Sequence, residues 1–355
     1  MATSAALLRV SVPLGVSVRT WVRYKVRMKP TLFLLTLALL VQAQTPASTK
    51  TSTPAYDRYL TGSAADVDRP VKGGLLLAGG GTDVQEAFRW LIDRAGGGDI
   101  VILRASGADG YHNFIQRLGT VDSIESIVFK SREAASEASI LQSLDGAEAI
   151  FLAGGDQSNY VEYWKDTPVE DAIHRAAKRG VPVGGTSAGL AVLSEFGFSA
   201  VNGSVTSEAA LADPFSDRIT LERDFLKLPH LAGIVTDSHF VERDRLGRTL
   251  VFLARMAAGG APARAIAIER ETAVLVDANG AATIAGNGPA FFFRTTKSAS
   301  VLKAATPLSI AGIEAYRAEA GASFDLKVWK GAGGKAYVLA VDAGKIISTS
   351  DPYGR

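Results

Sequence analysis

A serine flanked by glycines is the clearest chemical feature of the sequence. Residues 181–189 read Val-Pro-Val-Gly-Gly-Thr-Ser-Ala-Gly, and an apolar segment follows from Leu190. This pattern predicts a buried strand, a sharp turn and a helix, with the hydroxyl of Ser187 lifted clear of the sheet. Backbone N–H groups just beyond the turn would be free to stabilise an oxyanion. The alternative is a structural turn in which Ser187 only caps the residues after Leu190.

A serine nucleophile needs a neighbouring imidazole to take its proton, because its hydroxyl is a poor nucleophile at neutral pH. The sequence has four histidines, at positions 112, 174, 230 and 239. His174 lies in a helical pattern, His230 stands between a proline and a leucine, and His112 lies in a glycine-containing loop. His239 follows a predicted strand at residues 234–236, at the sheet edge expected to hold Ser187. It is therefore the best candidate base, the alternative being a solvated or capping histidine.

Three arginines follow His239 at once. Arg243, Arg245 and Arg248 are closely spaced, and at helical spacing Arg245 and Arg248 share a face. Guanidinium groups bind carboxylates through two parallel hydrogen bonds, so these residues suit recognition of an acidic substrate. The alternative is a solvated helix face in which Glu242 and Asp244 pair with the arginines.

Composition bounds the chemistry further. The 355 residues are 47% hydrophobic and carry a net charge of +2, so the chain can bury a large core. The basic residues are spread out, which gives no reason to expect a nucleic-acid partner. Cysteine is absent, which excludes a thiol nucleophile, thiolate metal sites and disulfides. Four histidines argue against a histidine-rich metal centre, so we expect neither metal nor cofactor.

Apolar strands alternate with helical patterns from Gly73 onward. This order predicts an α/β fold with a mainly parallel sheet covered by helices on both faces. Ligands bind such sheets at the carboxyl ends of the strands, where Gly79–Gly81 and the segment 154–157 should join Ser187. The glycines at 79–81 lack the G-x-G-x-x-G spacing, so no dinucleotide site is expected. The strands are expected at 73–78, 100–103, 126–129, 149–153, 181–185, 234–236 and 265–268, with helices at 83–94, 111–118, 133–144 and 160–179.

The ends of the chain have their own character. Basic residues precede an apolar run at 31–41, and Val41-Gln42-Ala43 fits signal-peptidase cleavage, so residues 1–43 are predicted to be a signal peptide, with Met28 as an alternative translation start. The apolar run is too short to span a bilayer, so a secreted or periplasmic protein is expected. Residues 44–70 are predicted to form a flexible linker, residues 71–275 the catalytic domain, and residues 276–355 a β-rich part packed on it.

Together these motifs resemble the cyanophycinase branch of the S51 serine peptidases, relatives of the aspartyl dipeptidase peptidase E. The similarity extends over most of the chain from Gly73, and the combination of motifs is far more specific than any one of them. It is carried by Gly-Gly-Asp-Gln at 154–157, Gly-Thr-Ser-Ala-Gly at 185–189, Asp-Ser-His-Phe at 237–240, Arg-x-Arg-Leu-Gly-Arg at 243–248 and Ala-Ile-Ala-Ile-Glu-Arg-Glu-Thr-Ala at 265–273.

The resemblance implies a fold like that of class I glutamine amidotransferases, often dimeric, and hydrolysis of cyanophycin or related aspartyl peptides. Cyanophycin is poly-aspartate with arginine on each β-carboxyl, and its cleavage yields β-aspartyl-arginine dipeptides. Ser187 then matches the nucleophile and His239 the base, with an oxyanion site formed by the N–H groups of Ala188, Gly155 and Asp156. The resemblance places these residues at the substrate pocket: Gln157, Asp237, Arg243, Arg245 and Arg248.

The acidic member of the triad stays open between two glutamates. Glu208, in the segment after the nucleophile, fits the place that the family gives to this acid. Glu269, at the end of the strand at 265–268, is an equal candidate, although the family's usual Asp-Glu pair reads Glu269-Arg270 here. Ser238 also departs from the family, which commonly has glutamine at this place, and this leaves the polymer substrate open.

Two other functions compete with this interpretation. Residues 185–189 also fit the G-x-S-x-G pattern of α/β-hydrolases, so a secreted esterase is an alternative. That fold places its histidine near the C-terminus, whereas no histidine follows His239 here. The second alternative is a secreted binding protein that keeps the pocket without turnover.

Overall fold

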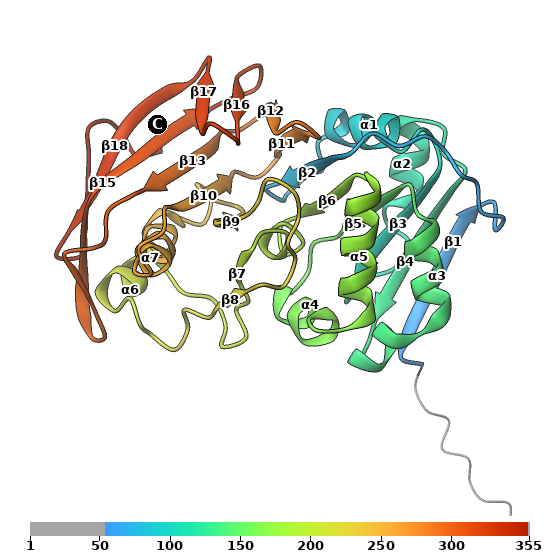
Figure 1. Ribbon diagram of the computed structural model, residues 1–355, viewed down its shortest axis with the longest axis horizontal. Coiled ribbons are helices and arrows are strands. Elements are labelled where there is room, and N and C mark those ends of the chain that lie inside the picture. The colour runs from blue at the N-terminus through green and yellow to red at the C-terminus, as the bar shows by residue number, and fades with distance from the viewer. Residues whose placement is uncertain (1–53, 354–355) are drawn as a thin grey trace, which may run out of the picture. The chain divides into compact units, whose positions relative to one another are not determined.

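The computed structural model describes residues 54–353, which lie in one compact unit (Figure 1). The predicted signal peptide falls outside the described residues. The helices are α1 (Gln85–Arg94), α2 (His112–Leu118), α3 (Ala138–Gly146), α4 (Gln157–Trp164), α5 (Pro168–Arg179), α6 (Ser207–Ala212) and α7 (Leu246–Ala257), with 3₁₀ turns η1 (Arg132–Ser136) and η2 (Leu190–Val192). None of the helices in this range is long and apolar enough to cross a membrane.

A ten-stranded sheet holds the serine turn. Its order is β1 (Tyr56–Gly62), β4 (Ser123–Phe129), β3 (Asp99–Arg104), β5 (Ala149–Leu152), β6 (Val183–Thr186), β2 (Gly74–Ala78), β11 (Thr272–Asp277), β12 (Ala281–Gly286), β16 (Ser323–Asp325) and β17 (Lys330–Ala332). Strands β4, β3, β5, β6 and β2 run parallel to one another. This parallel core confirms the expected α/β class and aligns the carboxyl ends of its strands at one edge.

Alternating side chains explain why both faces of this sheet are covered. In β2, Leu75 and Leu77 enter the core beneath α3, α4 and α5, while Leu76 and Ala78 face the core beneath α1 and α2. A strand that is buried on both faces has apolar residues at successive positions, which is typical of strands in a parallel sheet. Pro168 begins α5. Proline suits this position because the N–H group that it lacks would have no acceptor within the helix.

A second sheet was not anticipated from the sequence. Its nine strands run in the order β19 (Lys345–Ser348), β18 (Lys335–Asp342), β15 (Thr306–Ala318), β13 (Ala290–Thr295), β10 (Ala263–Ile268), β9 (Ile234–Asp237), β7 (Phe196–Phe198) and β8 (Leu221–Arg223), with β14 (Val301–Lys303) paired to β15. Helices α6 and α7 pack their apolar sides on one face of it. The strand that leads to His239 therefore belongs to a different sheet from the strand that leads to Ser187.

Two local expectations are wrong. Residues 56–62, expected within a linker, form β1, which pairs with β4 in an antiparallel register from Tyr56–Phe129 to Gly62–Ser123. This strand lies at the sheet edge with alternating exposure, so it has no apolar run to reveal it. The helix expected after Ser187 is only the single 3₁₀ turn η2.

The C-terminal strands do not form a separate layer. β16 and β17 extend the first sheet beyond β12, whereas β15, β18 and β19 extend the second beyond β13 (Figure 1). Phe324 of β16 stacks on Phe292 of β13, with ring centroids 3.8 Å apart. The β-rich character expected after residue 276 is thus shared between both sheets.

Candidate active site

Ser187 occupies a strained turn at the carboxyl end of β6. Its φ of 53° lies in the left-handed region, which costs a non-glycine residue of order 1 kcal/mol or more and recurs at functional sites. Glycine is required on both sides, because a Cβ at Gly185 would lie 2.7 Å from the carbonyl carbon of Gly189, and one at Gly189 would overlap the carbonyl of Leu152. The turn therefore exists only because these two positions lack side chains.

The end of β2 ties the two sheets together at the site. The carbonyl of Ala78 accepts the N–H of Ser187 at 3.1 Å, and the next carbonyl, that of Gly79, accepts the N–H of His239 at 2.9 Å. Gly80 packs so closely on the imidazole that a Cβ there would overlap Nε2 of His239. The backbone at residues 78–80 thus contacts both Ser187 and His239 and fixes their positions relative to each other.

Ser187 and His239 are within hydrogen-bond distance. Oγ of Ser187 lies 2.9 Å from Nε2 of His239, and Nδ1 of the same ring lies 2.8 Å from Oε2 of Glu242. A carboxylate can only accept, so Nδ1 carries the proton and Nε2 is free to accept from the serine hydroxyl. This is the tautomer that a general base for Ser187 requires.

The environment keeps the imidazole ready to accept a proton. Burial lowers the pKa of His239 below its ordinary value, the hydrogen bond to Glu242 opposes this, and the positive charges of Arg243 and Arg245 lower it further. The hydrogen bond from His239 lowers the pKa of Glu242, which therefore stays ionised at neutral pH. The pair is neutral imidazole and carboxylate at pH 7.

The carboxylate on His239 is neither of the two expected from the sequence. Glu208 lies exposed in the first turn of α6, and His239 has no hydrogen bond to it. Glu269 is buried, and its Oε2 accepts the N–H groups of Val241 and Glu242 at 2.5 and 3.1 Å. Glu269 therefore holds the backbone of the segment that carries His239 and Glu242, and its own carboxylate forms no hydrogen bond with the imidazole.

The sequence predicts Glu242 only as a partner for the arginines at 243–248, and Nε of Arg243 does lie 3.9 Å from its Oε2. Oε2 also accepts from His239, and Oε1 accepts from Arg270 at 3.0 Å, an arginine outside that set. The signal that could have revealed it is the i, i+3 spacing from His239, combined with the tight turn that the φ of 46° at His239 begins. Spacing alone did not show that this segment turns back on the imidazole.

The backbone around Ser187 offers donors for an oxyanion. Gly154 lies beside the serine, since a Cβ there would be 3.6 Å from Cβ of Ser187. Among the described residues, the N–H groups of Ala188, Gly155 and Asp156 donate to no protein acceptor. The Asp156 carboxylate is used elsewhere, because it caps α4 by accepting from Ser158. The N–H groups of the expected oxyanion site are therefore unpaired near Ser187.

Asp237 and Arg248, expected at the substrate pocket, form a buried ion pair with each other. Nε and a terminal nitrogen of Arg248 lie 2.9 and 2.5 Å from the Asp237 carboxylate, and Thr249 donates to it at 3.0 Å. Arg248 is 3% exposed. Burial pushes the pKa of Asp237 upward, but Arg248 and Arg245 outweigh this and leave the pKa lowered. These two residues support the His239 segment and do not face solvent.

Arg245, Arg243 and Gln157, the other residues expected at the pocket, differ in how far they are exposed to solvent. Arg245 donates to the carbonyl and hydroxyl of Ser238 at 2.8 and 3.1 Å, and burial lowers its pKa to about 10. Arg243 is open, with 53% of its side chain exposed beside Glu242. Gln157 begins α4 and donates to the carbonyl of Phe198 at 3.3 Å. Of the three arginines, Arg243 is therefore the one available to a ligand carboxylate.

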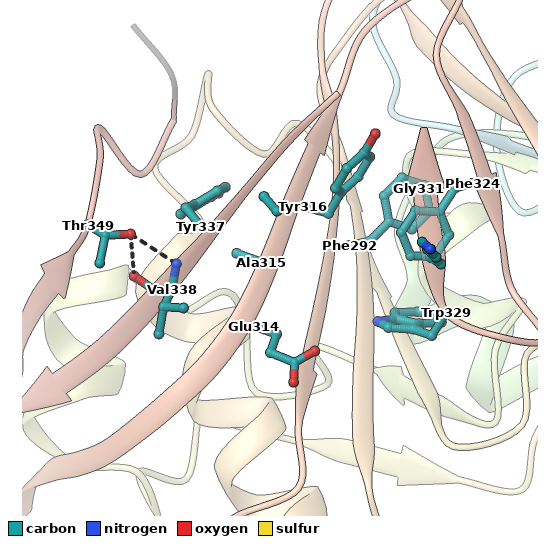
Figure 2. A pocket seen from close by; sticks show the side chains of 12 residues that line it. Phe292, Glu314, Ala315, Tyr316, Phe324, Trp329, Gly331, Tyr337, Val338 and Thr349 are labelled. Carbon is teal, nitrogen blue, oxygen red and sulfur yellow. Dashed lines mark hydrogen bonds between the residues drawn. The ribbon is translucent and has the colours of Figure 1, made fainter. Parts of the chain in front are cut away.

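A hollow of about 620 Å³ lies among the C-terminal strands. Figure 2 shows its aromatic side, where Phe292, Phe324 and Trp329 gather, and the Glu314 carboxylate across from them. None of the residues at the serine turn or the His239 segment lines it. Within residues 54–353, no group of three His, Asp or Glu side chains could hold a metal ion.

Residues 104–279 match the family model described as peptidase family S51. The cyanophycinase of Trichormus variabilis is 25% identical over 230 residues, covering 61% of this chain and 72% of that protein. The cyanophycinase of Synechococcus elongatus is 27% identical over 229 residues, covering 61% and 66%. A crystal structure of a peptidase from an acI-B1 Actinobacterium aligns with a TM-score of 0.49 and 18% identity, covering 72% of this chain and 98% of that one.

Proposed function

Because this chain belongs with the cyanophycinase-like proteins of peptidase family S51, we propose that it is a serine-type hydrolase of aspartyl peptide bonds. The observation that carries the proposal is the unbroken series of hydrogen bonds from Ser187 through His239 to Glu242, at 2.9 and 2.8 Å. A nucleophile, an oriented base and an ionised acid in this order are the parts of a catalytic triad.

In this mechanism His239 takes the hydroxyl proton as Ser187 attacks the amide carbonyl. The N–H groups of Ala188 and Gly155 stabilise the tetrahedral oxyanion, and Glu242 stabilises the imidazolium that forms. The imidazolium then protonates the leaving amine, and water activated by the same imidazole hydrolyses the acyl-enzyme. His239 carries out every proton transfer in this sequence, Ser187 is the nucleophile, and Glu242 orients and stabilises the imidazole without taking a proton.

The substrate is proposed to be cyanophycin or a related acidic peptide. Support comes from the relatives named cyanophycinase and from the exposed guanidinium of Arg243 beside the triad. A guanidinium at this place can bind a carboxylate of the aspartyl residue. The buried pairing of Arg248 with Asp237 supports a structural role for that arginine, so Arg243 is the arginine proposed to bind substrate.

Purified protein incubated with cyanophycin, β-aspartyl dipeptides and α-aspartyl dipeptides tests this directly. We expect hydrolysis of at least one aspartyl class, and a loss of about a thousandfold or more in kcat for Ser187→Ala. Hydrolysis of simple acyl esters without any aspartyl substrate would favour the esterase alternative instead. Binding without turnover would favour the binding-protein alternative.

A matched pair of variants tests the acid. Glu242→Gln should lower kcat strongly with little change in melting temperature, because glutamine cannot stabilise the imidazolium. Glu269→Gln should lower the melting temperature, because a buried acceptor of two N–H groups loses its charge. The reverse pattern would return Glu269 to the triad, and Glu208→Gln serves as the exposed control.

Export and dimerisation remain proposals that rest on the sequence and on the family resemblance. Sequencing the N-terminus of protein recovered outside the cytoplasm should find a start at residue 44 if residues 1–43 are a signal peptide. Light scattering of the purified protein tests the dimer.

A further inference from the structure

The turn between β10 and β11 carries an arginine that contacts the acid of the triad. β10 belongs to the second sheet and β11 to the first, so residues 269–271 cross between the sheets at the edge where β2 ends. A terminal nitrogen of Arg270 donates to Oε1 of Glu242 at 3.0 Å, while Oε2 of the same carboxylate accepts from His239 at 2.8 Å. Each oxygen of the Glu242 carboxylate therefore has its own hydrogen-bond donor.

A second carboxylate fixes the guanidinium of Arg270. The other terminal nitrogen donates to Oε1 of Glu271 at 3.0 Å, and the hydroxyl of Thr82 donates to the same oxygen at 3.3 Å. The arginine stem lies against Gly81, where a Cβ would be 3.1 Å from Cβ and 3.3 Å from Nε of Arg270. The N–H of Glu271 donates to the carbonyl of Gly80 at 2.7 Å. The guanidinium thus bridges two carboxylates from a turn that is fixed to the loop after β2.

The same turn holds both the main chain and the side chain of Glu242. Glu269 accepts the N–H of Glu242 at 3.1 Å, and Arg270 binds its carboxylate. The side chain of Glu242 is 36% exposed, and Nε of Arg243 lies 3.9 Å from it, beyond hydrogen-bond distance. An exposed glutamate populates several rotamers, whereas the hydrogen bond to His239 requires one of them. The contact with Arg270 favours that rotamer.

We propose that Arg270 is a positioning residue that acts through Glu242, holding the exposed carboxylate in the rotamer that orients His239 toward Ser187. This inference rests on the proposed hydrolase function and adds to it a residue that takes part in no proton transfer. The hydrogen bond from His239 is the main cause of the lowered pKa of Glu242, and the positive charge of Arg270 lowers that pKa further. The guanidinium therefore also helps to keep Glu242 ionised.

The contribution of Arg270 should appear in the rate and not in stability. Exposed ion pairs stabilise a fold little, because water screens them and ordering the side chains costs entropy. Arg270→Met should therefore melt within about 2 °C of wild type. The rate is more sensitive, because a displacement of about 1 Å at a reacting centre can cost about a hundredfold. With a peptide substrate, kcat should fall while KM changes little.

NMR of protein with isotope-labelled histidine measures the tautomer and the pKa of His239, with His239→Ala protein to assign its signals. The groups that face His239 are Glu242, Arg243 and Arg245 of its own segment, Ser187 after β6, the backbone of Gly80 after β2 and, through Glu242, Arg270 after β10. In Arg270→Met protein, the fraction with a proton on Nδ1 should fall. The pKa of His239 should fall as well, because its hydrogen bond to Glu242 raises that pKa.

The direction of the pKa change separates positioning from a simple effect of charge. Loss of a positive charge near His239 would by itself raise the pKa of the imidazole. Arg243→Met, which removes an exposed guanidinium that does not hydrogen-bond to Glu242, is the matched control and should raise the pKa without changing the tautomer. A pKa that is raised or unchanged in Arg270→Met protein, with an unchanged tautomer, overturns the proposal.

Fluorophosphonate labelling of Ser187 tests the same contact without any peptide substrate. Arg270→Met should slow labelling about tenfold, and Arg270→Lys should recover most of this loss, because an ammonium can still bind Oε1 of Glu242. Arg89→Met, which removes an exposed arginine of α1, should leave the rate unchanged. Equal labelling of wild-type and Arg270→Met protein overturns the proposal. If wild-type protein is labelled but hydrolyses no aspartyl peptide, the proposed substrate class fails, and both comparisons still decide the role of Arg270.

Discussion

Replacing Arg248 with methionine tests whether this arginine holds the fold or binds substrate. Methionine fills most of the space of the aliphatic stem but removes the guanidinium, which leaves Arg245 as the remaining cation beside the buried Asp237 carboxylate. Asp237 is 3% exposed, so water cannot replace the missing donors. Removal of one partner from a buried ion pair costs about 3–5 kcal/mol.

Urea and thermal unfolding at pH 7 measure this cost. About 3–5 kcal/mol corresponds to a fall of roughly 6–20 °C in melting temperature for a domain of this size. Neutral pH is the right condition, because the pKa of Asp237 is lowered in the folded protein. Its stabilisation is present above the ordinary aspartate pKa and is lost as pH falls through the lowered folded-state value.

Two further variants make the result decisive. Arg243→Met removes an exposed guanidinium of the same segment and should change stability by less than about 0.5 kcal/mol. Asp237→Leu combined with Arg248→Met should recover part of the lost stability, because the buried carboxylate no longer lacks its partner, although Arg245 then loses its own contact with Asp237. If the free energy of unfolding of Arg248→Met lies within about 1 kcal/mol of wild type and KM rises instead, Arg248 binds substrate and does not stabilise the fold.

Three other outcomes are expected. With a substrate that lacks a basic side chain, kcat/KM should rise with pH through a midpoint below 6.5, since His239 must be neutral to act as a base; a midpoint above 7 would contradict its lowered pKa. Gly80→Ala should lower kcat by about a hundredfold, because a Cβ there displaces the imidazole, and unchanged kinetics would mean that the base lies elsewhere. Gly331→Ala should cost about 1–3 kcal/mol of stability by clashing with Tyr316 while leaving kcat unchanged, as measured by urea unfolding and steady-state kinetics.

The parallel core could be predicted because its strands are apolar on both faces and separated by helical patterns. Residues 100–103 and 149–153 read as continuous apolar runs, and they form the adjacent strands β3 and β5. The edge strand β1 is not predictable in this way, because an edge strand buries little and its polar sequence resembles a linker. The division of the strands into two sheets could not be predicted either, because local sequence patterns do not show which distant strands pair with one another.

Ser187 and His239 could be proposed as a pair from the sequence, because each follows a strand at the expected sheet edge, and the structure places Oγ and Nε2 2.9 Å apart. The acid could not be found in this way. Its assignment depends on the turn at His239, where a φ of 46° brings Glu242 back to Nδ1 of the imidazole. The sequence offers Glu269 as an alternative triad acid, whereas its carboxylate accepts the N–H groups of Val241 and Glu242, and residue spacing does not encode which groups a buried carboxylate contacts.

Mass spectrometry after treatment with a fluorophosphonate tests the triad most directly, because this reagent reacts with a serine only when a base activates it. We expect a single adduct on wild-type protein, mapped to Ser187 by peptide sequencing, and a rate of labelling that falls at least about a hundredfold in His239→Ala. An adduct on another residue, or equal labelling of wild-type and His239→Ala protein, would contradict the assignment of Ser187 as a nucleophile activated by His239.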